Sequence, residues 1–275
     1  MKVITLLENT ACRADMKCEH GLSNYIETDK HRILFDMGPN AMFLENAEKL
    51  GVDIAAVDTA FLSHAHDDHC GGLELFCKRN DHAPVYLQKE AWGEYYVVTP
   101  AKCRFLGIDR HLHRFDGRFI LTEGHTLIDD ELQIFSGGMG RDYWSHANDT
   151  LREKVGDEFP RDAFRHEQNL IVSENGKAVL FAGCAHNGIV NILRRAEEIL
   201  GRAPDAVFGG FHLFNPSLGK AEPRELVEGV ARELLAREET VYYTGHCTGQ
   251  EAFGEMKEIL GERLQYMSGG SVAEI

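Results

Sequence analysis

The stretch "SHAHDDHCGG", residues 63–72, constrains this chain more than any other, because it puts three histidines, two aspartates and a cysteine together. Chance explains such a cluster poorly in a chain that has 14 histidines among 275 residues. The stretch directly follows "AAVDTAFL", an apolar run typical of a buried strand that ends at Ser63. Chemistry in α/β proteins is commonly placed on loops that leave such strands. We therefore expect an α/β fold with a functional site at this strand end.

The spacing within the stretch predicts a metal site. His64 and His66 are two residues apart, so on an extended segment both side chains project to the same side. Asp68 and His69 follow at the turn into a helix expected near Gly71, where they can face a second metal. Imidazole and carboxylate ligands suit Zn, Fe, Mn or Ni rather than a purely oxygen-ligated Ca²⁺ site. The alternative is a solvated loop in which the histidines are incidental.

Composition narrows the class of partner. The net charge of −15, from 44 acidic and 29 basic residues, argues against nucleic acid, which requires a basic footprint. It still allows a small anionic substrate, because a bound metal supplies local positive charge. The sequence contains no apolar run long enough to cross a membrane and no recognisable signal peptide. Its seven cysteines lack C-x-x-C spacing, so we expect a reducing, cytoplasmic compartment.

The pattern along the chain predicts a single domain over residues 1–275, without a linker or an internal repeat. A strand-rich first part is followed by alternating strands and helices, which favours two sheets between layers of helices. Residues 40–51 are typical of a helix, with Asn40 as its N-cap. Residues 93–118 show no clear pattern of a helix or a strand. The polar segment 138–167 indicates a long loop or a loose helical excursion, and we expect it to form a lid or insertion.

Three later stretches also place polar residues where an apolar strand ends: "FAGCAHNGI", "GGFHLFNP" and "YYTGHCTG". A Cys184 thiolate can bind zinc or iron, but this residue can equally be a small buried hydrophobe. His186 is either a ligand or a cap of the following helix. His212 is expected to contact the substrate or to be structural, and His246 to bind metal or to hydrogen bond to backbone. In the last stretch, we expect an anion to meet backbone N–H groups at Thr244, Thr248 and Gly249.

The stretch "SHAHDDHCGGL" resembles the H-x-H-x-D-H signature of the metallo-β-lactamase superfamily of metal-dependent hydrolases. "RILFDMG" resembles the strand that precedes this signature, with Asp36 at its supporting aspartate. "GLSNYIE", "GCAHNGIVNIL", "GGFHL" and "TGHCTG" resemble one branch of the superfamily. Some members of that branch are described as dihydropterin-ribofuranosylaminobenzene phosphate synthases. The resemblance covers nearly the whole chain.

The resemblance implies an αββα sandwich, that is, two mixed β-sheets flanked by helices, with a dinuclear metal site at one edge. It places Cys184 where many members carry an aspartate that bridges two metals, and His246 at the last metal-binding histidine. For the third histidine of the superfamily we prefer His186, then His166 and last His125. The implied metal ligands are His64, His66, Asp68, His69, Cys184, His186 and His246.

The expected function is therefore that of a hydrolase that uses two divalent metal ions, Zn with Mn or Fe as alternatives, against a small phosphorylated or ester substrate. Asp68 would orient water, and His212 would steady the substrate. Two other functions stay open. One is a transferase of the synthase type, and the other is a non-catalytic metal- or ligand-binding protein whose site is modified at Cys184. "GLSNY" is not a G-x-S-x-G elbow, so the sequence does not support a serine hydrolase. No predicted strand is followed by G-x-G-x-x-G, so it does not support a dinucleotide cofactor either.

Overall fold

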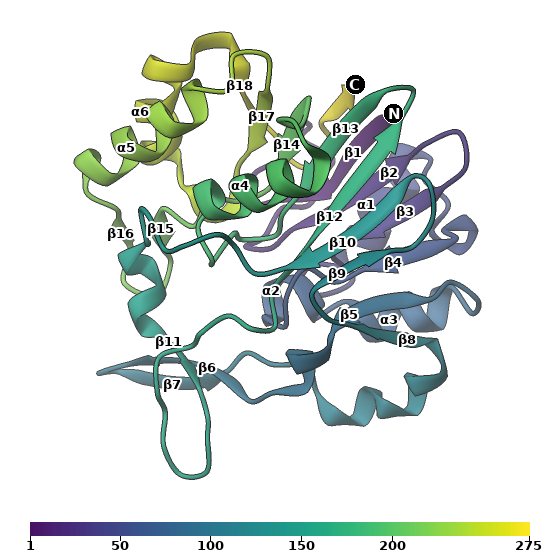
Figure 1. Cartoon of the computed structure of the whole chain (residues 1–275). Coiled ribbons are helices and arrows are strands. Elements are labelled where there is room, and N and C mark those ends of the chain that lie inside the picture. Colours follow the sequence, from purple (N-terminus) through teal and green to yellow (C-terminus); the bar gives the residue numbers. More distant parts are fainter.

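Two seven-stranded mixed sheets form the centre of the molecule in a computed structural model that describes residues 1–275 (Figure 1). In the first sheet, in the order β19-β1-β2-β3-β4-β5-β8, the strands from β3 to β8 run parallel. Its strands are β1 (Lys2–Leu7), β2 (Ser23–Glu27), β3 (Arg32–Phe35), β4 (Thr59–Phe61), β5 (Val85–Gln88), β8 (Phe119–Thr122) and β19 (Val272–Glu274).

In the second sheet, in the order β18-β17-β14-β13-β12-β10-β9, the strands from β13 to β18 run parallel and the others antiparallel. Its strands are β9 (His125–Leu127), β10 (Leu132–Ser136), β12 (Gln168–Glu174), β13 (Lys177–Phe181), β14 (Ala206–Phe208), β17 (Val241–Thr244) and β18 (Leu264–Tyr266). The predicted pair of mixed sheets is confirmed. The short strand β19 was not predicted, and it pairs with β1 in the first sheet.

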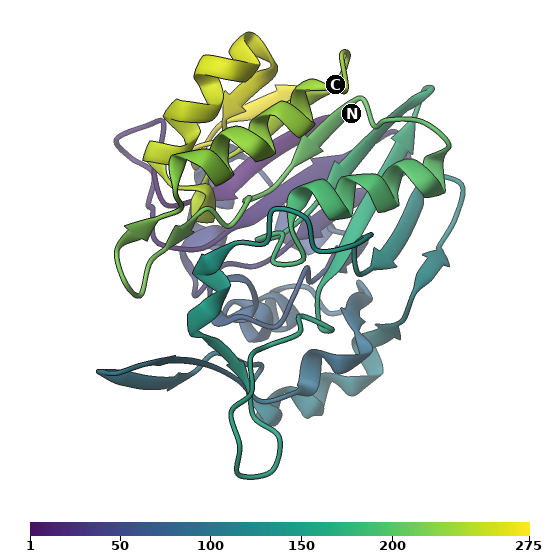
Figure 2. The same ribbon diagram turned by 60° about the vertical axis from the view of Figure 1, so that its left-hand side comes forward.

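Helices cover the outer face of each sheet, which completes the predicted αββα sandwich (Figures 1 and 2). Those near the first sheet are α1 (Met42–Leu50), α2 (Asp67–Cys70) and α3 (Leu73–Arg79), and those on the second are α4 (Ile189–Leu200), α5 (Arg224–Leu235) and α6 (Gln250–Leu260). The predicted N-cap Asn40 lies one residue before the observed cap Ala41 and accepts a hydrogen bond from the Met42 N–H. None of the helices combines the length and apolar character that a membrane crossing requires.

Strand alternation produces three apolar layers. On β3, Leu34 packs in the cluster with α1 and α3, whereas the next residue, Phe35, packs between the two sheets. On β13, Leu180 packs beneath α4 and α5, whereas Phe181 lies between the sheets and contacts Phe35 at a ring distance of 5.9 Å. Both of these strands therefore bury both of their faces, as the near-continuous apolar runs of their sequences indicate.

The two segments that sequence patterns described poorly pair with each other. Strands β6 (Tyr95–Thr99) and β7 (Lys102–Phe105) form a hairpin, and β11 (Leu151–Glu153) adds to it through β6. The prediction of a long loop or helical excursion over 138–167 was therefore wrong at β11, because a partner strand more than 50 residues away in sequence supplies its hydrogen bonds. A second hairpin, β15 (Phe214–Asn215) and β16 (Lys220–Ala221), follows β14.

Short 3₁₀ turns complete the chain: η1 (Ile54–Ala56), η2 (Lys89–Trp92), η3 (Arg110–Arg118), η4 (His146–Thr150), η5 (His246–Thr248) and η6 (Gly261–Arg263). The strands β4, β13, β14 and β17 belong to the parallel parts of the two sheets. Polar residues directly follow the carboxyl ends of these four strands, the position where α/β folds assemble their sites.

Candidate metal centre

The loops after these four strands bring the predicted ligands of the two sheets together. His64 and His66 follow β4, and His69 lies on α2. From the second sheet, Cys184 and His186 follow β13, His212 follows β14 and His246 begins η5. All of these side chains are buried, and Asp68 is partly buried. The clustering that the sequence predicted is therefore present in the fold.

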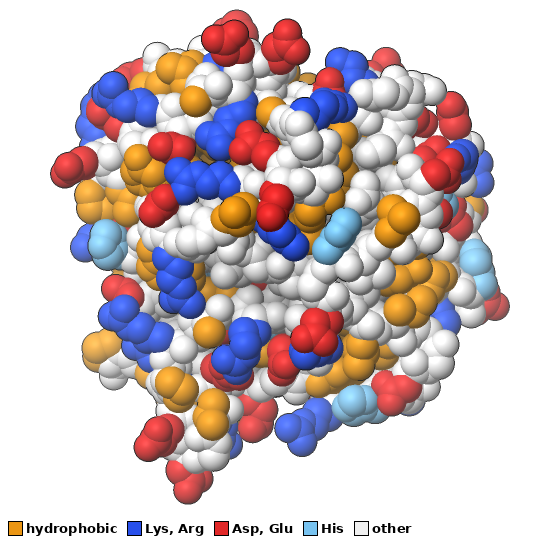
Figure 3. Space-filling model, in the orientation of Figure 1, with side chains coloured by type: hydrophobic (Ala, Val, Ile, Leu, Met, Phe, Trp, Pro, Cys, Tyr) orange, Lys and Arg blue, Asp and Glu red, His pale blue; other side chains and the backbone are white.

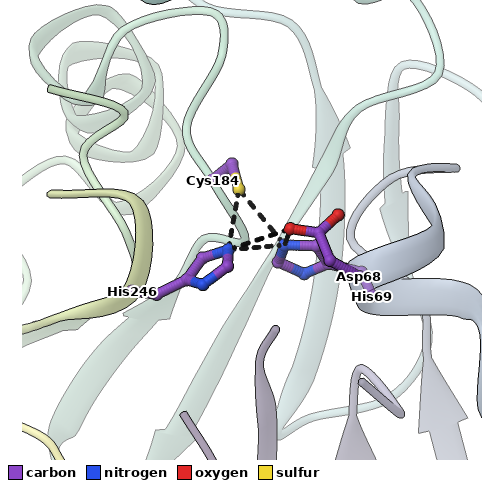
Figure 4. Close-up of side chains that lie close together, drawn as sticks. All are labelled: Asp68, His69, Cys184 and His246. Carbon is purple, nitrogen blue, oxygen red and sulfur yellow. Dashed lines mark hydrogen bonds and ion pairs between the residues drawn. The ribbon is translucent and has the colours of Figure 1, made fainter. Parts of the chain in front are cut away.

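The second-metal group, defined as Asp68, His69, Cys184 and His246, has its four ligand atoms in mutual contact (Figure 4). His69 Nε2 lies 3.1 Å from both Cys184 Sγ and His246 Nε2, and Cys184 Sγ lies 3.3 Å from His246 Nε2. Asp68 Oδ2 lies 3.2 Å from His246 Nε2 and 3.6 Å from His69 Nε2. Tetrahedral zinc with nitrogen, oxygen and sulfur ligands has ligand-to-ligand distances of about 3.3–3.8 Å, so these atoms would hold such an ion after moving apart by a few tenths of an ångström.

Hydrogen bonds on the far side of each ring direct its Nε2 atom toward the centre of the group. His69 Nδ1 donates to Asp36 Oδ2 at 2.7 Å, and His246 Nδ1 donates to Asn9 Oδ1 at 2.8 Å. In a neutral imidazole the other nitrogen, Nε2, then carries a lone pair. When both rings are neutral, two lone pairs and the Asp68 carboxylate converge on one point. Such an arrangement is unfavourable unless a cation lies between them.

The first-metal group, defined as His64, His66 and His186, has ring centroids 4.6–4.9 Å apart. His186 Nδ1 donates to Asn148 Oδ1 at 3.0 Å, and the Asn148 amide donates to the His186 carbonyl, which fixes the amide orientation. His64 Nδ1 lies 2.9 Å from the Ser63 hydroxyl. The two Nε2 atoms of His64 and His186 face each other at 3.3 Å, again as two lone pairs.

The two alternatives for the third histidine differ clearly from His186. His166 Nδ1 accepts from the Ala65 N–H at 3.1 Å, and its Nε2 donates to Asp162 at 3.0 Å, so neither nitrogen has a free lone pair. His125 is exposed on the edge strand β9, where its Nε2 contacts Gln133. The geometry therefore favours His186, the first preference from the sequence.

Asp36 forms hydrogen bonds with both ends of the signature segment, at Ser63 and at His69. Its carboxylate accepts from the Ser63 N–H, the Ser63 hydroxyl and His69 Nδ1, each at 2.7 Å, and it is fully buried. Its φ of +62° is a left-handed conformation that is uncommon outside glycine. Ala185, His212 and His246 share this conformation, so backbone strain is concentrated around the cluster.

Two supporting residues, Asp162 and Glu167, had no usable signal in the sequence. Asp162 Oδ2 lies 3.9 Å from His66 Nε2, and the histidines nearby hold the pKa of this carboxyl low although burial opposes it. Glu167 accepts from the N–H groups of His186 at 2.6 Å and Asn187 at 2.9 Å, which fixes the turn that presents His186. Burial raises the pKa of Glu167. Such residues orient ligands without touching a metal.

His212 is buried and strained, and its ring makes no hydrogen bond. Neither ring nitrogen has a partner, φ is +48°, and the ring lies 4.1 Å from that of His186. Its ligand atom also lies within 4.8 Å of the sulfur atoms of Cys184 and Cys247. A buried polar group without a partner is costly, so this arrangement points to a ligand or substrate at His212. Sequence reasoning did not single out Cys247.

The three residues expected to hold an anion through their backbone are not brought to the cavity beside the cluster. The Thr244 and Thr248 hydroxyls contact each other at 2.6 Å, and Thr248 also accepts from the Phe211 N–H. The Gly249 N–H donates to the His246 carbonyl. These groups stabilise the loop that carries His246.

A cavity of about 270 Å³ opens onto the cluster. Its metal-facing side includes His66, Asp68, Cys184, His186 and His212. Its outer walls come from the small sheet, from η4 and β11 within the predicted lid segment, and from the β15–β16 hairpin. On the face seen in Figure 3, Lys and Arg are interspersed with Asp and Glu and form no continuous basic surface.

Protonation differs between the two groups. Burial, together with the neighbouring histidines, lowers the pKa of His64 and His186 well below the ordinary value, so both rings are neutral at pH 7. Burial also opposes charge on His69, but Asp68 and Asp36 outweigh it and raise its pKa to about 9. In the metal-free protein His69 therefore carries a proton that a metal must displace.

We expect metal binding at the second-metal group to release about two protons below pH 9, one from His69 and one from the Cys184 thiol, whose pKa burial raises. Because the His69 ring and the Cys184 thiol are both protonated in this range, apparent metal affinity should increase up to about a hundredfold per pH unit between pH 7 and 9. Above pH 9 the increase should be less steep, since only the thiol proton is left to displace. Calorimetric zinc titrations in buffers of different ionisation enthalpy measure the proton count. Zinc uptake without proton release in this range would contradict the expectation.

An αββα sandwich with clustered histidines at the carboxyl ends of its strands defines a class of metal-binding proteins. The chain belongs to the metallo-beta-lactamase superfamily, whose family description matches residues 16–246. Members of this superfamily are generally enzymes that bind divalent metals.

Individual relatives agree with this membership. An uncharacterized protein of Methanocaldococcus jannaschii is 32% identical over 220 residues, covering 77% of this chain and 79% of its own. The 7,8-dihydropterin-6-methyl-4-(beta-D-ribofuranosyl)-aminobenzene-5'-phosphate synthase of the same organism is 27% identical, over 99% and 96% of the two chains. The solved structure of Tm1679, described as a metal-dependent hydrolase of the beta-lactamase superfamily, is 26% identical with a TM-score of 0.84, covering 100% of this chain and 99% of its own.

Proposed function

We propose that this protein is a metal-dependent hydrolase that uses two divalent ions against a small anionic substrate, a phosphate ester or another ester. The observation that carries the proposal is the convergence of histidine Nε2 atoms, Asp68 and Cys184 in two adjoining groups. Neighbouring groups fix these ring orientations, which is the arrangement that metal ligands require. The seven free cysteines suit a reducing, cytoplasmic compartment.

His64, His66 and His186 would hold the first ion, and Asp68, His69 and His246 the second. Cys184 belongs to both sets, since its sulfur also lies within 4.8 Å of ligand atoms of His64 and His186. A thiolate in this position favours zinc or iron over manganese. When bound, a metal pair of this kind lowers the pKa of water toward neutrality and polarises a phosphoryl or carbonyl oxygen.

The protein's own residues would then orient the reactants. Burial opposes charge on Asp68, but the neighbouring His69 and His20 rings hold its pKa well below the ordinary range, so it stays ionised. An ionised carboxylate at this place can accept a hydrogen bond from a water molecule and orient it. His212, with both ring nitrogens unpartnered at the cavity wall, can hold an oxygen of the substrate.

A transferase is the second candidate function, and the relative described as a synthase, aligned over 99% of this chain, supports it. Pyrophosphate release from a pterin pyrophosphate donor would distinguish this reaction from hydrolysis. A non-catalytic binding protein is the remaining possibility, and it would bind metal without turnover of either kind.

Metal analysis with a hydrolysis assay tests the proposal. We expect about two equivalents of transition metal in the purified protein, and metal-dependent hydrolysis of bis(p-nitrophenyl) phosphate or p-nitrophenyl acetate. Chelation should remove the activity, and added zinc should restore it. Less than one equivalent of bound metal after reconstitution would contradict the proposal.

Exchange of the shared cysteine should change the metal preference. Cys184→Asp restores the ligand that is usual in the superfamily, so we expect two bound ions but a shift from zinc toward manganese, because carboxylate is the harder ligand. Cys184→Ala should instead weaken both sites. Mass-spectrometric metal analysis after exposure to equimolar Zn²⁺ and Mn²⁺ measures the shift. An unchanged zinc-to-manganese ratio in Cys184→Asp would show that the sulfur is not a ligand.

A further inference from the structure

The outer wall of the cavity contains a basic strand. Lys102 and Arg104 are the only lysine and arginine among the residues that line the cavity, and both lie on β7. They are two residues apart on an extended strand, so their side chains project to the same side. In Figures 1 and 2 the β6–β7 hairpin extends from the body beside η4, with the β15–β16 hairpin beyond it.

Arg104 forms an ion pair, whereas Lys102 does not. The Arg104 guanidinium pairs with the carboxylate of Asp67, at the first residue of α2. This ion pair links β7 to the segment that carries the metal-binding signature. Lys102 makes no ion pair and no hydrogen bond. Its charge is therefore available at the cavity mouth of a protein whose net charge is −15.

The acidic residues of the cavity cannot neutralise Lys102, since they have other partners. Asp67 is paired with Arg104, and Asp68 Oδ2 lies 3.2 Å from both His20 and His246. Between the metal-facing side and β7 the wall is apolar and includes Val97, Leu106 and Leu151. This wall separates the metal centre from a single free positive charge.

We infer that Lys102 binds a second anionic group of the substrate, outside the metal centre. The inference rests on the proposed function, which places the reacting phosphate or ester at the metals. It narrows the substrate to a small molecule with two anionic ends, a phosphate or carboxylate at Lys102 and the reacting group at the metals. The short segment that joins these ends packs on the apolar wall. Arg104 has a positioning role, because its ion pair with Asp67 holds β7 over the cavity.

Binding of three probes to the zinc-loaded protein tests the inference. Orthophosphate occupies only the metal centre, whereas inorganic pyrophosphate and 4-carboxyphenyl phosphate carry a second anionic group. In the unmodified protein we expect at least one of these two to bind more tightly than orthophosphate. Lys102→Ala should lose about tenfold in affinity for that probe and less than twofold for orthophosphate. The difference between variant and parent should shrink as salt rises from 0.05 to 0.5 M, as expected for a charge contact.

Lys2→Ala is the matched control, because Lys2 is exposed on β1, has no ion pair and does not line the cavity. It removes the same charge from the protein and should leave the affinity for all three probes unchanged. Equal losses for all probes in Lys102→Ala, or no loss for any, would overturn the role of Lys102 while leaving the proposed function intact. Failure of orthophosphate itself to bind the zinc-loaded parent would count against the proposed function, and the inference would fall with it.

Discussion

Replacing His246 with alanine is expected to reduce bound metal from two equivalents to about one and to lower metal-dependent turnover about a thousandfold. His246 Nε2 contacts the other three members of the second-metal group. Loss of one ion removes several kcal/mol of transition-state stabilisation, and each 1.36 kcal/mol is a factor of ten in rate. Metal content by mass spectrometry and initial rates with a generic phosphodiester give the two readouts.

His125→Ala is the matched control, since it removes an exposed histidine that lies outside both groups. It should keep two equivalents of metal and the parent rate. If His246→Ala also kept both ions and the full rate, the second-metal group would not be a metal site. If it kept both ions but lost activity, His246 would act on the substrate rather than as a ligand.

Asp36→Asn is expected to lower the free energy of unfolding by about 2–4 kcal/mol and zinc affinity by about 10–100-fold. Asparagine tolerates the left-handed backbone at this position, so the loss would not come from φ. It would come from the hydrogen bonds, because an amide nitrogen would face donors on Ser63 and His69 where a carboxylate oxygen now accepts. Urea unfolding of the metal-free protein measures the change in the free energy of unfolding separately from the change in zinc affinity.

Asp58→Asn serves as the comparison, because Asp58 is a half-exposed carboxylate that accepts from the Arg32 N–H and lies outside the metal centre. We expect it to change stability by less than about 1 kcal/mol and zinc affinity not at all. Equal effects of the two substitutions would mean that Asp36 has no special role beneath the signature.

The part of the site that sequence predicted is the part encoded locally. The two-residue spacing of His64 and His66, followed by Asp68 and His69 at a helix start, defines a ligand geometry within six residues. Cys184, His186 and His246 stood out as polar residues at the ends of apolar strands, and the resemblance to the superfamily implied that they bind metal. The αββα fold was implied by the resemblance to the superfamily, and alternating strands and helices pointed the same way.

The features of the fold and the site that the sequence did not predict depend on contacts between residues distant in sequence. His166 and His186 both lie near a strand of the second sheet, and only the hydrogen bonds of their ring nitrogens distinguish them. Asp162 lies beside His66 in the fold, although nearly a hundred residues separate the two in sequence. Strand β11 is polar and short, and it exists because β6 pairs with it. No periodicity marks such a strand, since its hydrogen bonds come from the tertiary fold.

The candidate centre takes its ligands from both sheets, and this has a consequence for folding. His69 and Cys184 are separated by 115 residues, and His69 and His246 by 177. An ion held by all three would act as a removable cross-link between the two halves of a chain whose cysteines are all unpaired. Packing of the two sheets offsets the entropy lost in closing so long a loop before the ion arrives. The ion therefore binds to a preformed pocket. Metal supply would then set how firmly the two halves stay docked.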